Sequence, residues 1–178
     1  MTKISFFNFL SQLRLGPTPE FLAKQLRKPT GFFSKKVGNT MNRANGVLYD
    51  FALETMGLQA GSEVLEIGFG NGKMFPKLFS KAPGIRVTGL DFSADMVKQA
   101  RRNNAPLLQS GKLQIHEGAS NCTPFPDNSF DKVFCINVLY FWDNPEEHLR
   151  EVLRVLKPGG AFYPIIRSKE SMLTMPFT

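Results

Sequence analysis

The stretch VLEIGFGNG, residues 64–72, joins an apolar run to an acid and three glycines. Glycine weakens any regular element that it interrupts, so Gly68, Gly70 and Gly72 indicate a backbone that turns sharply or lies against something else. The acid, Glu66, stands just before them in the apolar run. The stretch therefore predicts a strand that ends in a tight glycine loop beside a carboxylate.

Strand-like and helical patterns alternate around this loop. The β-type runs cover residues 63–67, 85–90, 112–116, 130–136 and 160–166, and the helical patterns cover 39–57, 72–81, 93–104 and 145–156. Ser93 is a natural N-cap, Pro145 suits a first helical turn, and the glycines of KPGG (157–160) are expected to end the last helix. The alternation predicts an α/β fold, namely a Rossmann-like, doubly wound and mostly parallel sheet.

The composition fits one globular domain. The chain has 178 residues, 42% hydrophobic and 21% charged, and no apolar run approaches the roughly 20 residues of a membrane helix. The N-terminus has no signal-peptide pattern, so we expect a cytoplasmic protein. Two cysteines and two histidines argue against a disulfide framework and a histidine-built metal site, and no metal is expected.

The first residues differ in character from the rest. Residues 1–38 form a basic, Phe-rich N-terminal extension, and residues 39–178 form the main domain. Residues 1–50 hold eight Lys/Arg against two acids, which is +6 of the net +7. This charge could attract an acidic substrate, a lipid surface or a nucleic acid, or it could be a solvated face without a partner. The amphipathic stretch 6–15 allows a peripheral membrane contact, but packing on its own domain is the favoured interpretation.

Ligands of such sheets bind beyond the carboxyl ends of the strands, where the glycine loop lies. A dinucleotide site requires G-x-G-x-x-G, but the third position is Lys73 and the glycines are spaced G-x-G-x-G. Glu66 would repel a pyrophosphate and attract a cation. S-adenosylmethionine carries an ammonium and a sulfonium and no phosphate. The loop therefore favours S-adenosylmethionine over a nicotinamide cofactor.

Four motifs in order strengthen this interpretation. They are VLEIGFGNG, VTGLDFS (87–93), GASNCTPFPDNSFDKVFCINVLYFW (118–142) and EVLRVLKPGGAFY (151–163). With them, the chain from about residue 39 to 166 resembles the class I S-adenosylmethionine-dependent methyltransferases. It is most similar to their small-molecule branch, which includes ubiquinone- and menaquinone-biosynthesis enzymes. The resemblance implies methyl transfer from S-adenosylmethionine to a small-molecule acceptor.

The resemblance also implies a set of cofactor-binding residues. Glu66, the loop glycines and Asn137 would approach the methionine half, Asp91 the ribose hydroxyls, and Phe92, Ala119 and Ser120 the adenine. In one respect the chain departs from the family pattern. Ala119 stands where the family commonly has an acid that accepts a hydrogen bond from the adenine amino group. Loss of that bond would cost about 1 kcal/mol, or roughly fivefold in affinity.

The acceptor side is less defined, and no catalytic residue is assigned. Tyr140 and Trp142 could line an acceptor pocket or belong to the core, and Arg43 could bind an anionic or lipid-like acceptor. His148 could act as a base, but the helical pattern of residues 145–156 favours a place on the helix surface. The NPPY-type motif of DNA and protein amino-group methyltransferases is absent, and we expect no nucleic-acid partner.

The end of the sequence suggests an incomplete sheet. Class I domains usually finish with a further helix and an antiparallel hairpin, and no such hairpin follows residues 160–166. That strand would be an exposed edge, so we expect either self-association through it or lower stability than in a longer chain. The short sheet and Ala119 leave an alternative function open, a cofactor-binding scaffold with weak or no turnover.

Overall fold

A computed structural model describes residues 27–28, 30–31, 34–168 and 170. Most of the predicted N-terminal extension, including the amphipathic stretch 6–15, lies outside the described residues. Among the helices of the described part, none is long and apolar enough to cross a bilayer.

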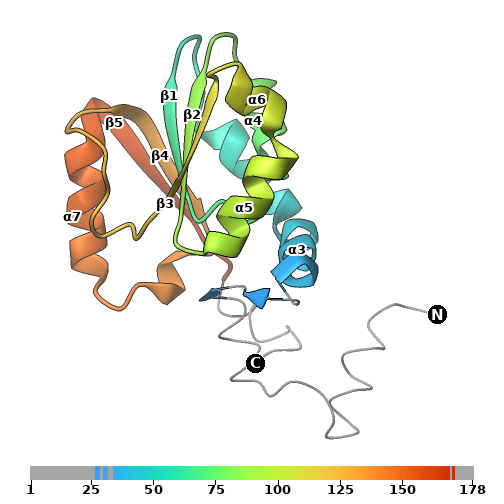
Figure 1. Cartoon of the computed structure of the whole chain (residues 1–178). Coiled ribbons are helices and arrows are strands. Elements are labelled where there is room, and N and C mark those ends of the chain that lie inside the picture. Colours follow the sequence, from blue (N-terminus) through green and yellow to red (C-terminus); the bar gives the residue numbers. More distant parts are fainter. Residues whose placement is uncertain (1–26, 29, 32–33, 169, 171–178) are drawn as a thin grey trace, which may run out of the picture.

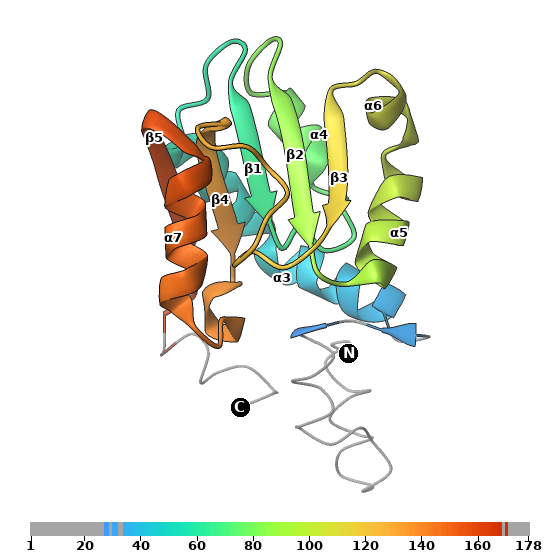
Figure 2. The same cartoon turned by 60° about the vertical axis from the view of Figure 1, so that its left-hand side comes forward.

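The domain is built on a sheet of parallel strands in the order β3-β2-β1-β4-β5. The strands are β1 (Glu63–Ile67), β2 (Arg86–Asp91), β3 (Leu113–Glu117), β4 (Phe130–Ile136) and β5 (Leu156–Ile165). The arrowheads of β1 to β4 point the same way in Figure 2. The predicted Rossmann-like parallel sheet is confirmed.

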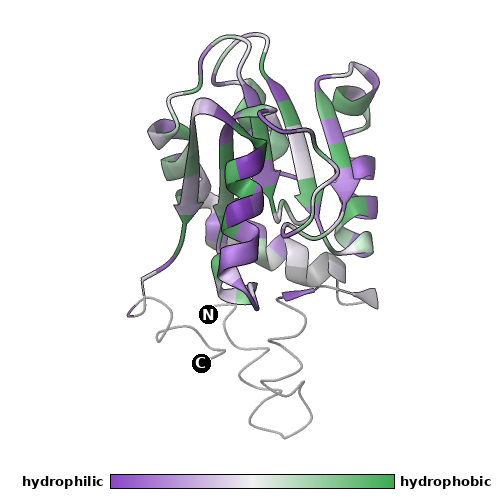
Figure 3. Ribbon diagram, turned by 90° about the vertical axis from the view of Figure 1, so that its left-hand side faces the viewer, coloured by the Kyte–Doolittle hydropathy of each residue, from purple (hydrophilic) through white to green (hydrophobic). Residues whose placement is uncertain are grey.

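Helices cover both faces of this sheet, as Figure 1 shows. On one face lie α3 (Ser34–Thr55), α4 (Phe75–Phe79), α5 (Ala94–Asn103) and α6 (Ala105–Gln109). On the other lies α7 (Pro145–Val155), which follows the short 3-10 helix η2 (Leu139–Phe141). In Figure 3, α7 stands in front and is largely hydrophilic, with hydrophobic colour concentrated in the elements behind it.

Alternating strand residues form two buried clusters. Val64, Val87 and Phe134 pack against the helices of the α3 face, whereas Leu65 and Val133 pack on the α7 face. Strand residues alternate between faces, so every strand buried on both sides needs apolar residues at successive positions. This explains the continuous apolar runs in the sequence, and it leaves the strand ends as the places where polar side chains gather.

The helix predicted over residues 72–81 shortens to α4 at 75–79, and two further boundary changes have an identifiable cause or consequence. Helix α3 begins at Ser34 rather than at residue 39, so the proposed boundary at residues 38 and 39 falls inside a helix. The expectation that KPGG ends the last helix is wrong. Helix α7 ends at Val155, and Leu156 is already extended and pairs with Phe130 of β4. Pairing with the sheet therefore stops the helix before the glycines.

Strand β5 occupies an edge of the sheet and pairs with β4 alone in the described part of the chain. Its register shifts near the start, where β4 advances from Phe130 to Lys132 while β5 advances from Leu156 to Ala161. The four residues of KPGG thus lie opposite Asp131 alone, so the ladder is irregular there.

The N-cap at Ser93 is confirmed, since its side chain accepts a hydrogen bond from the Met96 N–H.

Candidate functional site

A cavity of about 390 Å³ lies at the carboxyl ends of the strands. The loops after four strands contribute to it, and so does one face of α3. Its lining includes residues 66–70, 90–92, 118–121, 136–138 and 141–144, with Gly38, Met41, Asn42, Asn45 and Tyr49 of α3 and with Glu147 and His148 of α7. The cavity therefore lies where ligands of parallel α/β sheets bind.

The three loop glycines are required for different reasons. All have positive φ, at 74° for Gly68, 61° for Gly70 and 68° for Gly72. A Cβ at Gly68 would lie 2.5 Å from Cγ2 of Val138, and one at Gly72 would lie 2.7 Å from Cβ of Ala100. A Cβ at Gly70 would meet nothing within 4 Å, so its backbone faces open space. The loop is thus fixed by close contacts at its two ends and leaves its middle bare.

Asp91 ends β2 beside this loop and is only 6% exposed. Its Oδ2 accepts a hydrogen bond from the Gly70 N–H, and its Oδ1 accepts one from the Ser93 N–H, both at 2.9 Å. Burial raises the pKa of the Asp91 carboxyl to about 6, although these two bonds favour the charged form. Each oxygen keeps lone-pair capacity beyond its one bond, so the carboxylate can still accept hydrogen bonds from a ligand.

Glu66, on the neighbouring strand β1, is 5% exposed and also lines the cavity. The Tyr49 hydroxyl donates a hydrogen bond of 2.9 Å to its Oε2. Burial raises the pKa of Glu66 to about 8, and the charge of Asp91 adds to this rise, while the bond from Tyr49 opposes it. A cation in the cavity would favour the ionised form of Glu66.

Asn137 follows β4 with a positive φ of 57°. Its Nδ2 donates to Oδ1 of Asn45 on α3 at 2.9 Å, and its Oδ1 accepts from the Arg167 N–H at 3.1 Å. A non-glycine residue with positive φ persists only where its surroundings hold it. The two side-chain bonds supply that support and bring α3 to the end of β4.

The loop after β3 brings Ser120 to α7. Its Oγ lies 2.7 Å from Nδ1 of His148, and the His148 ring stacks on Trp142 with centroids 4.6 Å apart and an interplanar angle of 2°. His148 therefore keeps part of its surface exposed, as the helical pattern favours, but it also contacts the β3 loop and Trp142. The first turn of α7 lies at the cavity, so a residue that the helical pattern places outward is half-buried against the β3 loop.

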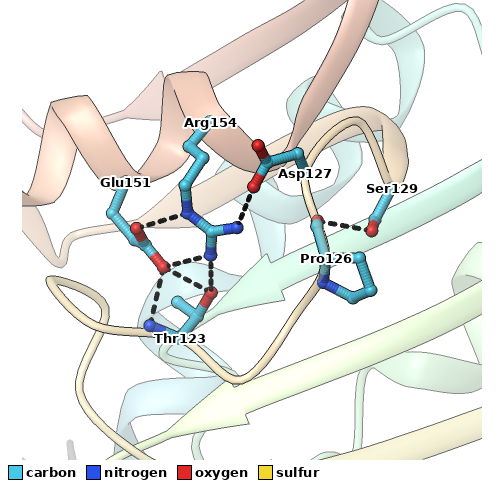
Figure 4. Close-up of polar contacts among 6 residues, drawn as sticks. All are labelled: Thr123, Pro126, Asp127, Ser129, Glu151 and Arg154. Carbon is cyan, nitrogen blue, oxygen red and sulfur yellow. Dashed lines mark hydrogen bonds and ion pairs between the residues drawn. The ribbon is translucent and has the colours of Figure 1, made fainter.

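Figure 4 shows what holds this loop on α7. Glu151 Oε1 accepts from the Thr123 N–H at 2.7 Å and from its hydroxyl at 2.8 Å. Arg154 donates to Glu151 at 2.6 and 2.9 Å and to Asp127 at 2.5 Å. The Arg154 bond is the main reason why the pKa of Glu151 falls to about 2. This network joins the β3–β4 connection, and Ser120 with it, to the helix.

The structure brings most of the sequence-predicted residues to the cavity. Those on its lining are Glu66, Gly68, Gly70, Asp91, Phe92, Ala119, Ser120, Asn137 and Trp142. Gly72 packs behind the loop, against Ala100. Tyr140 is not part of the lining, because it turns to the backbone of Arg167 and donates a 3.0 Å bond to its carbonyl. Arg43 belongs to α3, and its side chain lies outside the described residues.

Other residues at the cavity were not predicted. Asn42, Asn45 and Tyr49 follow one another at helical spacing on α3, and all three line the cavity. That spacing of polar groups is the signal that could have identified this face of the helix. At the rim, Arg27 pairs with Asp143 at 2.5 Å and Lys28 Nζ lies 5.3 Å from the Phe92 ring centroid.

Comparison with known families agrees with this geometry. The family described as a methyltransferase domain matches residues 65–163, which is more than half of the chain. The match begins within β1 and ends in β5, so it includes every loop that bears a predicted cofactor residue. The chain belongs to this methyltransferase domain family.

Individual relatives extend the similarity. The ubiquinone/menaquinone biosynthesis C-methyltransferase UbiE of Pseudomonas savastanoi is 35% identical over 123 residues, covering 67% of this chain and 47% of that protein. The uncharacterized methyltransferase YdaC of Bacillus subtilis is 28% identical, covering 69% and 66%. A SAM-dependent methyltransferase structure from Aquifex aeolicus has a TM-score of 0.59 at 25% identity, covering 72% and 69%. The chain thus spans about half to two thirds of the length of these two curated relatives.

Proposed function

We propose that this domain transfers a methyl group from S-adenosylmethionine to a small-molecule acceptor. The observation that carries the proposal is the pair of buried carboxylates, Glu66 and Asp91, on one cavity at adjacent strand ends. Two buried acids suit a ligand with a cationic part and a diol. They suit a pyrophosphate poorly, because its charge would oppose the ionisation of both acids and would repel each one once it is ionised.

The residues at the strand ends divide the cofactor between them. Glu66 and the Asn137 region would face the methionine half, and Asp91 would accept hydrogen bonds from the ribose hydroxyls. Gly70 allows close approach because a Cβ there would meet nothing within 4 Å and the bare backbone faces open space. Phe92, which is 37% exposed beside Asp91, offers a face for the adenine ring. In dinucleotide-binding folds, too, an acid at the end of the second strand accepts hydrogen bonds from the ribose.

When bound, S-adenosylmethionine would supply a methyl group on a cationic sulfur. The acceptor would attack the methyl carbon in line with the carbon–sulfur bond, and the sulfur would leave. The contribution of the protein is to hold an acceptor in line and to exclude water. The Asn45–Asn137 pair, where α3 meets the end of β4, is the proposed acceptor side. Trp142 lines the cavity and remains a candidate for this side, whereas Tyr140 is bonded elsewhere. The role of Arg43 in binding an anionic or lipid-like acceptor stays a prediction.

The test is product formation. The purified chain is incubated with S-adenosylmethionine and a panel of small acceptors, including quinols because one relative is named for ubiquinone and menaquinone biosynthesis. Formation of S-adenosylhomocysteine together with a methylated acceptor supports the proposal. Tight cofactor binding without methylation of any acceptor would instead favour the scaffold alternative.

A cytoplasmic location of the protein also stays a prediction.

A further inference from the structure

Ser120, His148 and Trp142 form a cluster at the cavity, and His148 is the member to which the proposed function has given no role. His148 Nδ1 is engaged with the Ser120 hydroxyl at 2.7 Å, and one ring face is covered by Trp142. Its other nitrogen, Nε2, has no hydrogen-bond partner among the described residues, although His148 lines the cavity. An imidazole fixed at one nitrogen and along one face presents the second nitrogen in a defined direction.

The topology places Ser120, which follows β3, at one end of the cofactor, and His148 reaches that end from α7 through its contact with Ser120. The strand ends follow one another in the order β4, β1, β2, β3, and Glu66 and Asp91 stand at β1 and β2. A ligand with its cationic part at Glu66 and its diol at Asp91 has its base beyond Asp91, toward the end of β3. The Gly118 N–H donates to the Asp91 carbonyl at 3.0 Å, so the loop that bears Ser120 starts beside the ribose position.

This end of the cavity lacks an acid in the loop. Ala119 cannot accept a hydrogen bond through its side chain. The side chain of Asn121 is turned to α7, where its Nδ2 donates to Glu147 at 3.2 Å. An adenine carries a 6-amino group, which costs affinity if it is left without an acceptor. A neutral imidazole with its proton on Nδ1 has an accepting lone pair on Nε2.

We propose that His148 is the residue that selects adenine in the cofactor, with Nδ1–H donating to Ser120 Oγ and Nε2 accepting from the 6-amino group. Ser120 is a positioning residue, because its hydroxyl holds Nδ1 and with it the ring orientation, and in this proposal it accepts from Nδ1–H. Trp142 holds the ring plane by stacking. The inference rests on the proposed use of S-adenosylmethionine.

The electrostatic surroundings agree with a neutral ring. Burial lowers the pKa of His148, and the charges of Glu147 and Asp143 oppose this decrease. Asp143 is itself paired with Arg27 at 2.5 Å, which offsets part of its charge. At neutral pH the lone pair on one ring nitrogen is therefore available.

The experiment compares S-adenosylhomocysteine with S-inosylhomocysteine, in which a 6-oxo group replaces the 6-amino group. Isothermal titration calorimetry gives the affinity of each ligand for the wild type and for His148→Ala. The wild type should prefer the adenine ligand by about five- to tenfold, and His148→Ala should bind both about equally. His116→Ala is the matched control, since His116 does not line the cavity and should keep the preference.

Ser120→Ala provides a second and milder variant. It should reduce the preference for the adenine ligand and shift the His148 ring ¹⁵N resonances toward a mixture of tautomers. An unchanged preference in folded His148→Ala, or a wild type that prefers the 6-oxo ligand, would overturn the inference while leaving the proposed function intact. Failure of the folded wild type to bind either ligand would overturn both. A lower turnover with unchanged preference would assign His148 to the acceptor instead.

Discussion

Replacement of Glu66 by glutamine should separate the structural cost of this side chain from its role in binding. Glu66 is buried, accepts the Tyr49 hydroxyl and has its pKa raised to about 8. Glutamine has the same shape and still offers an oxygen to Tyr49, but it cannot ionise. The substitution therefore removes a charge from the cavity without opening a void.

The sign of the stability effect follows from the direction of the pKa shift. In the unfolded chain Glu66 ionises near its ordinary pKa of 4.5, whereas in the folded chain it stays protonated up to about pH 8. The folded state thus binds the extra proton between these values, and wild-type stability falls as pH rises through them. A displacement of this size corresponds to a loss on the order of 5 kcal/mol above pH 8.

Glu66→Gln should escape this loss. Its free energy of unfolding in urea should match that of the wild type near pH 5 and exceed it by a few kcal/mol at pH 9. Cofactor binding should move in the opposite direction, weakening by at least about tenfold at pH 8.5 because the attraction for a cationic ligand is lost. Glu54→Gln, the same change at an exposed position of α3, controls for general charge effects. Parallel stability curves for Glu66→Gln and wild type would refute the reasoning.

Three further predictions concern the loop, the helix clamp and the sheet edge. Gly68→Ala should lower the free energy of unfolding by more than Gly111→Ala in chemical denaturation, since both have positive φ but only the first Cβ meets a neighbour, Val138. Glu151→Gln should flatten the acid limb of a pH–stability curve, because the stabilisation from its lowered pKa is lost as pH falls from 4.5 toward about 2. The edge at residues 160–166 should cause either self-association in sedimentation or a lower melting temperature than that of a longer chain, and a monomer as thermally stable as the longer chain would show that this edge is already covered.

Much of the architecture could be predicted because its causes are local. The runs at residues 63–67 and 130–136 match β1 and β4 at both ends, since parallel strands buried on both faces are rich in apolar residues. Gly68 and Gly72 were predicted as sites of sharp turning or close approach, and the structure identifies Val138 and Ala100 as what they approach. Asp91 could be placed because it directly ends a strand next to the glycine loop.

The remaining features depend on contacts between distant segments. The place of His148 against Ser120 follows from how α7 docks on the β3 loop, which helical periodicity does not encode. Tyr49 becomes a partner of Glu66 only because α3 crosses the end of β1. The end of α7 was misjudged for the same reason, since pairing of Leu156 with β4 overrides the glycines that follow.

Calorimetry with S-adenosylhomocysteine on the wild type and on Asp91→Ala tests the central claim most directly. Asp91 is the buried acid assigned to the ribose, and hydrogen bonds to a charged group are worth about 1.5–3 kcal/mol each. We predict that the wild type binds and that Asp91→Ala, shown to be folded by its thermal melt, binds at least about tenfold more weakly. A folded wild type that does not bind, or an Asp91→Ala variant that binds equally well, would contradict the account.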